Sequence, residues 1–242
     1  MSVRRGVPLV AIAMVACASA SWDGRVDTWG SMHAVMHDGD TQGRVRLSDA
    51  IADPHAFGIG ALTGLSGEIA IVDGTAWTSR VDAAGRIETS KALHFGDEAT
   101  LLAVAHVAHW STGPIEHDLA LGELGEYVRR RADQLGLQRT LTFPFLITGD
   151  LDELDAHVLN GRCPYAGPGA GPDAAATAPV EDARARAHGT LVGFYTDGEA
   201  GKLTHRGERT HVHVVLEGVD PFVGHVDAAR VLSGASLALP AP

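Results

Sequence analysis

Three histidines near the C-terminal end of the chain have the spacing of a metal site. His211 and His213 are two residues apart in a β-prone run, and alternate side chains of a strand project to the same face. His225 follows a turn rich in glycine, aspartate and proline, so a neighbouring strand would bring it beside the pair. Three neutral imidazoles suit Zn²⁺ and leave one coordination position open, as in catalytic sites. The pattern therefore predicts Lewis-acid chemistry, although Fe, Mn, Ni and Cu use similar ligands.

The same histidines allow two other interpretations. They could alternate on the solvent face of an edge strand and bind nothing. Glu217 and Gly224 also complete a His-x-His-x3-Glu-x6-Gly pattern, which is similar to the first metal motif of cupins and would indicate a metal-dependent oxygenase. A cupin needs a second histidine motif well downstream, and only 17 residues follow His225. The cupin-like alternative therefore ranks second.

Composition limits the class of protein. With 242 residues and 45% apolar side chains, the chain can bury a sizeable core, as one large domain or two small ones. The formal charge of −11 argues against a nucleic-acid partner. No apolar stretch after the first 20 residues is long enough to span a membrane. Composition therefore argues against nucleic acid and a membrane span, and the sequence leaves a homodimer open.

The N-terminus has the features of an export signal. Arg4 and Arg5 precede an apolar run that ends in small residues. Cleavage after Ala20 would release a secreted protein, whereas cleavage before Cys17 would leave a lipid anchor. We therefore expect residues 1–21 to be a leader and the protein to be periplasmic or extracellular, with a buried N-terminal strand as the alternative. Either cleavage leaves the mature chain without a disulfide framework.

The chain around the histidines is predicted to be rich in strands. Short apolar or alternating runs predict strands, and the Asp73-Gly74 pair predicts a hairpin turn because its residues tolerate positive φ angles. Apolar residues at helical spacing predict a helix over 122–137. A weaker helix, or a strand, is expected over 97–109. The expected strands cover residues 44–47, 69–73, 76–81, 143–148, 189–195, 210–216 and 223–226.

A change in composition divides the chain. Residues 164–187, rich in proline, glycine and alanine, are predicted to be a flexible linker. It would separate an N-terminal mixed-sheet domain, 22–163, from a C-terminal metal-binding β-sheet portion, 188–242. The predicted fold class is a mixed, β-rich α/β protein, with two packed mixed sheets or a partial barrel and few helices. The site is expected where the two parts meet.

Two blocks of short motifs occur in a fixed order. The first contains Phe57-Gly58-Ile59-Gly60, Leu65-Ser66-Gly67-Glu68 and Val72-Asp73-Gly74, and the second contains Gly189-Thr190-Leu191-Val192-Gly193-Phe194-Tyr195, His211-Val212-His213 and Gly224-His225-Val226. Their order and spacing resemble those of the acetolactate decarboxylase family over nearly all of the chain after the leader. The resemblance implies that His211, His213 and His225 hold Zn²⁺ and that Glu68 lies beside the metal. It also implies conversion of 2-acetolactate, or a related α-hydroxy-β-keto acid, to acetoin and CO₂ through a metal-bound enediolate.

The resemblance gives Glu68 the role of a general acid or a group that positions the substrate. The alternative is an exposed carboxylate on a hairpin strand. The family's active-site arginine is matched by Leu146, which cannot pair with a carboxylate. The family's C-terminal glutamate has no counterpart in residues 234–242. An exported homologue that binds a metal or small ligand without catalysis is therefore a second hypothesis.

Other histidines could replace part of what is missing. His157 is our candidate to contact an anionic ligand, with a strand histidine bound to backbone or water as the alternative. His55, just before the first block, has a weaker claim of the same kind. His205 is expected to be a loop residue outside the site.

Overall fold

The computed structural model describes most of the chain after the N-terminus. Residues 1–20, which hold nearly all of the predicted leader, and residues 165–176, which hold half of the predicted linker, lie outside the described residues. Within the part of the chain that is described, no helix is long and apolar enough to cross a membrane. The described residues are 21–162, 164, 177–198, 201–205 and 207–242.

The first sheet has seven antiparallel strands in the order β1-β7-β3-β4-β5-β6, with β2 also paired to β7. The predicted turn joins β4 to β5, with positive φ at both Asp73 and Gly74. Its strands are β1 (Asp27–Trp29), β2 (Val45–Arg46), β3 (Ala56–Leu62), β4 (Glu68–Val72), β5 (Thr75–Val81), β6 (Ile87–Ser90) and β7 (Glu98–His106).

Strand β7 corrects one prediction. The weaker helix expected over 97–109 is wrong, and the alternative of a strand is right. Residues 99–105 of β7 are all buried, so both faces of the strand carry apolar side chains. A strand buried on both faces loses the alternation that distinguishes it from a helix in sequence.

The second sheet also has seven strands, in the order β8-β14-β10-β11-β12-β13-β9. Strand β10 pairs with β13 as well as β11, so β10 to β13 close on themselves, which matches the predicted partial barrel. The strands are β8 (Trp110–Pro114), β9 (Leu119–Ala120), β10 (Thr142–Val158), β11 (Val180–Thr196), β12 (Thr210–Leu216), β13 (Phe222–Val231) and β14 (Ser236–Pro240).

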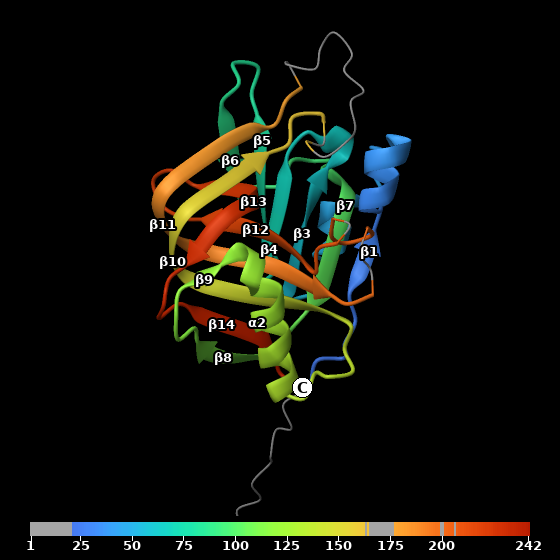
Figure 1. The fold of residues 1–242 in the computed structure, drawn as a ribbon. Coiled ribbons are helices and arrows are strands. Elements are labelled where there is room, and N and C mark those ends of the chain that lie inside the picture. Colours follow the sequence, from blue (N-terminus) through green and yellow to red (C-terminus); the bar gives the residue numbers. More distant parts are fainter. Residues whose placement is uncertain (1–20, 163, 165–176, 199–200, 206) are drawn as a thin grey trace, which may run out of the picture.

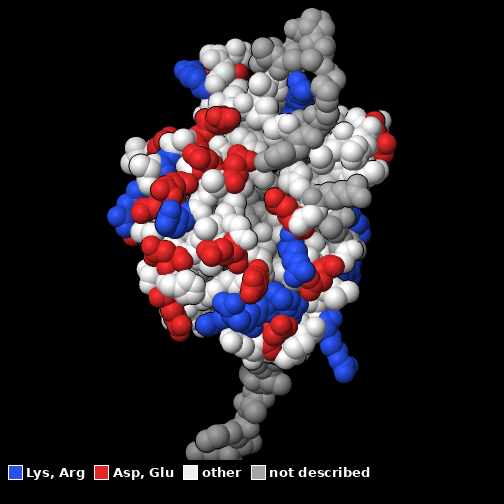
Figure 2. All heavy atoms as spheres, viewed as in Figure 1, with Lys and Arg blue, Asp and Glu red and all other residues white. Residues whose placement is uncertain are grey.

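Helices are few and mostly short. The predicted helix is α2 (Leu121–Gln134), whose apolar face contributes Leu124, Tyr127, Val128 and Ala132 to the core. Figure 2 shows basic side chains gathered over α2, with acidic side chains spread over much of the same face of the molecule. The other helical segments are a π-helix, η1 (Ala34–Asp38), α1 (Leu47–Ala50) and a 3-10 turn, η2 (Thr63–Leu65).

The two sheets pack face to face, with their strands crossing (Figure 1). One core cluster lies between them, where Phe57 and Ile59 of the first sheet meet Phe194 and Val215 of the second. A second cluster covers the outer face of the first sheet. A third lies between the second sheet and α2. The fold is thus a layered, β-rich structure of the predicted class.

The two sheets do not divide at the predicted boundary. Strands β8, β9 and β10 precede residue 163 but belong to the sheet of the C-terminal strands. Residues 180–187 of the predicted linker are the first residues of β11. The chain therefore passes from the first sheet to the second between β7 and β8. Strand β10 belongs to the second sheet because it pairs with β11 and β13.

Candidate metal centre and active site

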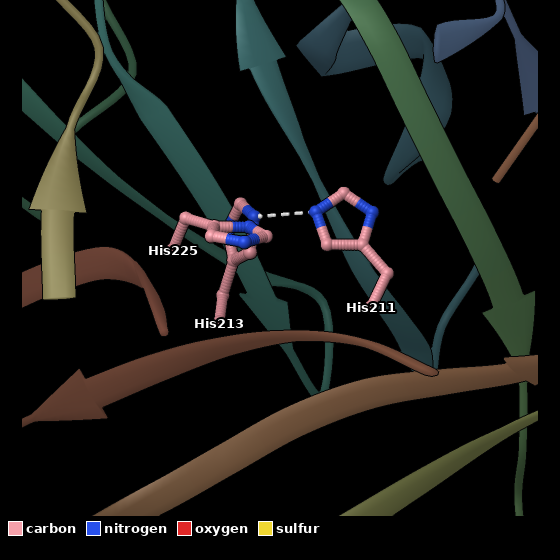
Figure 3. A group of neighbouring side chains, drawn as sticks. All are labelled: His211, His213 and His225. Carbon is pink, nitrogen blue, oxygen red and sulfur yellow. Dashed lines mark hydrogen bonds between the residues drawn. The ribbon is translucent and has the colours of Figure 1, made fainter. Parts of the chain in front are cut away.

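The metal-site histidines converge because of strand geometry. His211 and His213 lie on the same face of β12, and His213 is the direct cross-strand partner of His225 on β13. Directly opposed residues of antiparallel strands hold their side chains within contact distance. Figure 3 shows the three rings turned toward one another. One ligand nitrogen from each ring lies within 4.8 Å of the other two.

Backbone carbonyls fix the orientation of two of these rings. His211 Nδ1 lies 2.8 Å from the carbonyl oxygen of Leu203, and His213 Nδ1 lies 2.8 Å from that of Ile69. A carbonyl only accepts, so each Nδ1 carries the proton and each Nε2 presents a lone pair. The two Nε2 atoms are 3.2 Å apart. Two facing lone pairs repel unless a cation lies between them.

The 3.2 Å between the Nε2 atoms of His211 and His213 fits two ligands of a tetrahedral metal. Ligands bound at roughly 2.0–2.1 Å in tetrahedral geometry are separated by about 3.3 Å. Burial lowers the pKa of His211 to about 4 and lowers the pKa values of His213 and His225 well below the usual range. All three imidazoles are therefore neutral near pH 7, the form that binds metal. The residues present fit a Zn²⁺ ion.

Glu68 faces this cluster from the first sheet. It is only 2% exposed, so it is not the exposed carboxylate of the alternative interpretation. Its Oε2 lies 3.6 Å from His213 Nε2, and its Oε1 accepts a hydrogen bond of 3.4 Å from the backbone of Leu159. Burial raises the pKa of Glu68 to about 7, against an opposing effect of His157. The carboxyl group can therefore hold or release a proton in the neutral range.

The preceding glycine allows this approach. Gly67 has a φ of +155°, and a Cβ on it would come within 2.1 Å of the carbonyl oxygen of Ser79. Any other residue would push β4 away from β5 at the point where Glu68 begins the strand.

His157 lies next to the metal-site histidines. His157 lies on β10 and is the cross-strand partner of His225 on β13, and the two ring centroids are 5.0 Å apart. Its Nδ1 is 2.7 Å from Oδ2 of Asp227. Burial lowers the pKa of His157, but the hydrogen bond to Asp227 and the charges of Glu68 and Asp227 outweigh burial and raise it overall. His157 is thus the histidine of this group that favours the charged form.

These groups line one pocket between the two sheets. One side of the pocket is polar and the other is apolar. The polar side consists of Glu68, His157, His205, His211, His213 and His225, and the apolar side of Met32, Val35, Ala61, Leu65, Leu101 and Leu159. The apolar side chains form a core cluster of their own. Such a pocket suits a small ligand with one polar and one alkyl end.

Two predictions about neighbouring residues have clear outcomes in the structure. His55 lies outside the pocket, on the surface, where its Nδ1 is 2.9 Å from Asp73 Oδ1. Leu146 packs against the core between the sheets, away from the pocket lining. The C-terminal stretch forms β14, which pairs with β8 and β10 and carries no acidic residue.

Sequence reasoning missed two residues. His205 was expected outside the site, but it lines the pocket, with its ring centroid 5.7 Å from that of His225. Asp227 was not considered, although it contacts His157. Asp227 is two residues after His225, which is the one signal in the sequence that could have identified it.

Comparisons with known proteins concern the family and the fold. A family model described as alpha-acetolactate decarboxylase matches residues 29–239. The crystal structure of alpha-acetolactate decarboxylase from Bacillus subtilis strain 168 is similar, with a TM-score of 0.68 and 19% identity over 90% of this chain and 85% of that one. A Staphylococcus aureus protein of unknown function, similar to alpha-acetolactate decarboxylase, has a TM-score of 0.67 and 18% identity over 88% and 84%. No curated protein sequence matches significantly.

Proposed function

The chain belongs to the alpha-acetolactate decarboxylase family, and we propose that it is a Zn²⁺-dependent carboxy-lyase. Its substrate would be 2-acetolactate or a related α-hydroxy-β-keto acid, and its products acetoin, or the matching hydroxyketone, and CO₂. One observation carries the proposal: three neutral histidines, Glu68 and His157 meet in a single buried pocket. The match to the family also argues against the cupin-like alternative.

His211, His213 and His225 would hold the metal. When bound there, Zn²⁺ supplies a Lewis acid that polarises a ketone oxygen. The chain supplies the surroundings of the reacting carbon. Met32, Val35 and the other apolar side chains face the alkyl groups of the substrate and keep water out.

Decarboxylation needs a proton at the carbon that loses CO₂. The carboxylate leaves as CO₂, and its bonding electron pair remains on the substrate as an enediolate. One proton must then be added to carbon on one face. Glu68 is the carboxyl group that faces the pocket beside His213, so it is placed to deliver that proton or to hold the hydroxyl group.

His157 would contact the acid group of the substrate. Its Nδ1 is anchored by the carboxylate of Asp227, and its position beside His225 puts it next to the metal ligands. A charged imidazole can pair with a carboxylate, although with one donor rather than the two of an arginine. This would compensate in part for Leu146, which packs against the core between the sheets.

The direct test is product formation. The purified mature chain with one equivalent of Zn²⁺ is incubated with 2-acetolactate, and acetoin and CO₂ are measured. The proposal expects both products in equal amounts. Zinc binding without acetoin would reject acetolactate as the substrate, and the same assay with homologous α-hydroxy-β-keto acids then tests the broader proposal.

A second candidate function is a homologue that binds a metal or small ligand without catalysis. The residue that matches the family's arginine is a half-buried leucine, and β14 provides no glutamate, which favours this candidate. Replacement of Glu68 separates the two. Glu68→Gln should stop turnover and spare zinc in an enzyme, whereas a binding protein would retain its ligand affinity.

Export of the protein stays a proposal. It is supported by Arg4 and Arg5 before an apolar run and by two cleavage signals. Mass spectrometry of the protein from its native host would show a start after Ala20 for secretion, or a lipid-modified Cys17 for anchoring. An intact Met1 would contradict both.

A further inference from the structure

An irregularity in β13 lies at the edge of the pocket. Ala156 of β10 pairs with Val226, but the preceding residue, Asp155, pairs with Ala228. The register shift makes Asp227 the extra residue of a β-bulge. Bulges are common beside active sites, where they redirect a side chain.

The bulge changes which way β13 side chains face. Val226 and Ala229 are three residues apart, yet both belong to the core cluster under α2. In a regular strand, residues three apart face opposite sides. The extra residue absorbs this difference: Asp227 keeps the face of His225, two residues before it, and the alternation reverses after it, so that Ala229 returns to the core. Asp227 Oδ2 then lies 2.7 Å from His157 Nδ1.

The anchor of His157 differs from those of two metal ligands. His211 and His213 each donate from Nδ1 to a neutral backbone carbonyl, whereas His157 donates to a carboxylate. A hydrogen bond with a charged acceptor is shorter and stronger than one with a neutral acceptor. The His157 side chain is 6% exposed and that of Asp227 is 31% exposed, so Asp227 holds the buried ring from the rim of the pocket.

We propose that Asp227 is a positioning residue, which lies on the face of β13 that carries His225 and fixes the His157 ring with Nδ1 outward and Nε2 toward the pocket. Asp227 acts through His157 and does not touch the substrate. The claim that His157 contacts the substrate rests on the proposed function. The claim that Asp227 holds the His157 ring does not. Loss of Asp227 would free the ring to rotate or to move its proton to Nε2.

A double-mutant cycle tests this role. Asp227→Ala should lower kcat/KM for 2-acetolactate by about 10- to 100-fold, the usual cost of losing the partner of an active-site histidine. In a His157→Gln background the same change should alter kcat/KM by less than about twofold, because the group it positions is gone. Equal losses in both backgrounds would show a merely structural role and overturn the proposal.

A matched control and a milder variant accompany the cycle. Asp155→Asn removes an exposed carboxylate from the same bulge and should leave kcat/KM unchanged. Asp227→Asn keeps the shape of the side chain but not its charge, so kcat/KM should fall less than in Asp227→Ala. Zinc affinity should stay within about twofold in all of these variants, since none changes a ligand. Where Asp227→Ala does not fold, Asp227→Asn takes its place in the cycle.

Nitrogen NMR makes the test independent of turnover. In ¹⁵N-histidine protein, at a pH high enough for the His157 ring to be neutral, the signals of His157, assigned with His157→Gln, should show the proton on Nδ1 in the wild type. Asp227→Ala should shift protonation toward Nε2. An unchanged Nδ1 proton in Asp227→Ala would overturn the proposal. If the wild type releases no CO₂, the proposed function fails, while the NMR result still decides the role of Asp227.

Discussion

The polar side chains of the pocket form two groups that are built differently: the ligand side (His211, His213 and His225) and the substrate side (Glu68, His157 and His205). The ligand side comes from two adjacent strands, and backbone carbonyls of Leu203 and Ile69 fix two of its rings. The substrate side gathers Glu68 from β4, His157 from β10 and His205 from a loop. A ligand set on neighbouring strands follows from local register. On the substrate side, Glu68 depends on how the two sheets pack, and His157 depends on the pairing of β10 with β13.

The two sides also differ in charge. Burial keeps the ligand histidines neutral, as metal binding requires. On the substrate side, the pKa values of Glu68 and His157 are both raised. The pocket thus combines neutral ligands with groups that can carry protons and charge, and variants of each side should fail in different ways.

The largest effect is expected on the ligand side. His213→Ala removes a ligand whose ring is fixed by the Ile69 carbonyl, so zinc affinity should fall by more than about 100-fold, beyond the usual cost of losing an outer contact. Turnover should fall with it. Zinc titration measures the affinity, and His55→Ala, a surface histidine, is the control. Unchanged zinc binding in His213→Ala would remove the basis for the metal centre.

Glu68→Gln should break the substrate side and leave the ligand side intact. The amide keeps the shape of the side chain but cannot deliver a proton, so kcat should fall by about 10²- to 10⁴-fold. Zinc content should stay at the wild-type level. Steady-state kinetics with metal analysis checks both values. Loss of zinc in this variant would mean that the two sides are not separable.

His157→Gln should weaken substrate binding more than chemistry. Removal of a cationic contact to the substrate carboxylate should raise KM by about 10-fold, which corresponds to roughly 1.4 kcal/mol, with a smaller change in kcat. Initial rates over a range of acetolactate concentrations separate the two constants. A fall in kcat at constant KM would assign His157 to proton transfer instead.

A change in the shared scaffold should alter stability alone. A Cβ at Gly189 would come within 2.5 Å of the Leu216 side chain and 2.7 Å of the Val215 carbonyl oxygen. Gly189→Ala should therefore cost about 1–3 kcal/mol in free energy of unfolding, because the carbonyl cannot move aside. Urea denaturation measures this cost, and kcat of the folded protein should not change. A lower kcat would show that strain in β11 reaches the pocket.

The sequence predicted the ligand side better than the substrate side. His211, His213 and His225 could be grouped from strand alternation and one return strand, and the structure brings them together. The family resemblance pointed to Glu68, which packing of the first sheet brings to the same pocket. Their roles as ligands and proton donor stay predictions.

Features that depend on tertiary contacts could not be read from the sequence. The strand β7 was ambiguous because both of its faces are buried. The boundary between sheets was missed because β10 pairs with strands that follow it much later in the chain. His205 sits in a polar loop without periodicity, and the contact of Asp227 with His157 depends on the pairing of β13 with β10, which are far apart in the chain.

The central claim is that one metal on the three histidines makes this pocket a decarboxylase. Its most direct test is the rate of CO₂ release from 2-acetolactate as Zn²⁺ is added to metal-free protein. The account predicts that activity rises in proportion to bound zinc and levels off at one equivalent. Full occupancy of the histidines without CO₂ release would contradict it.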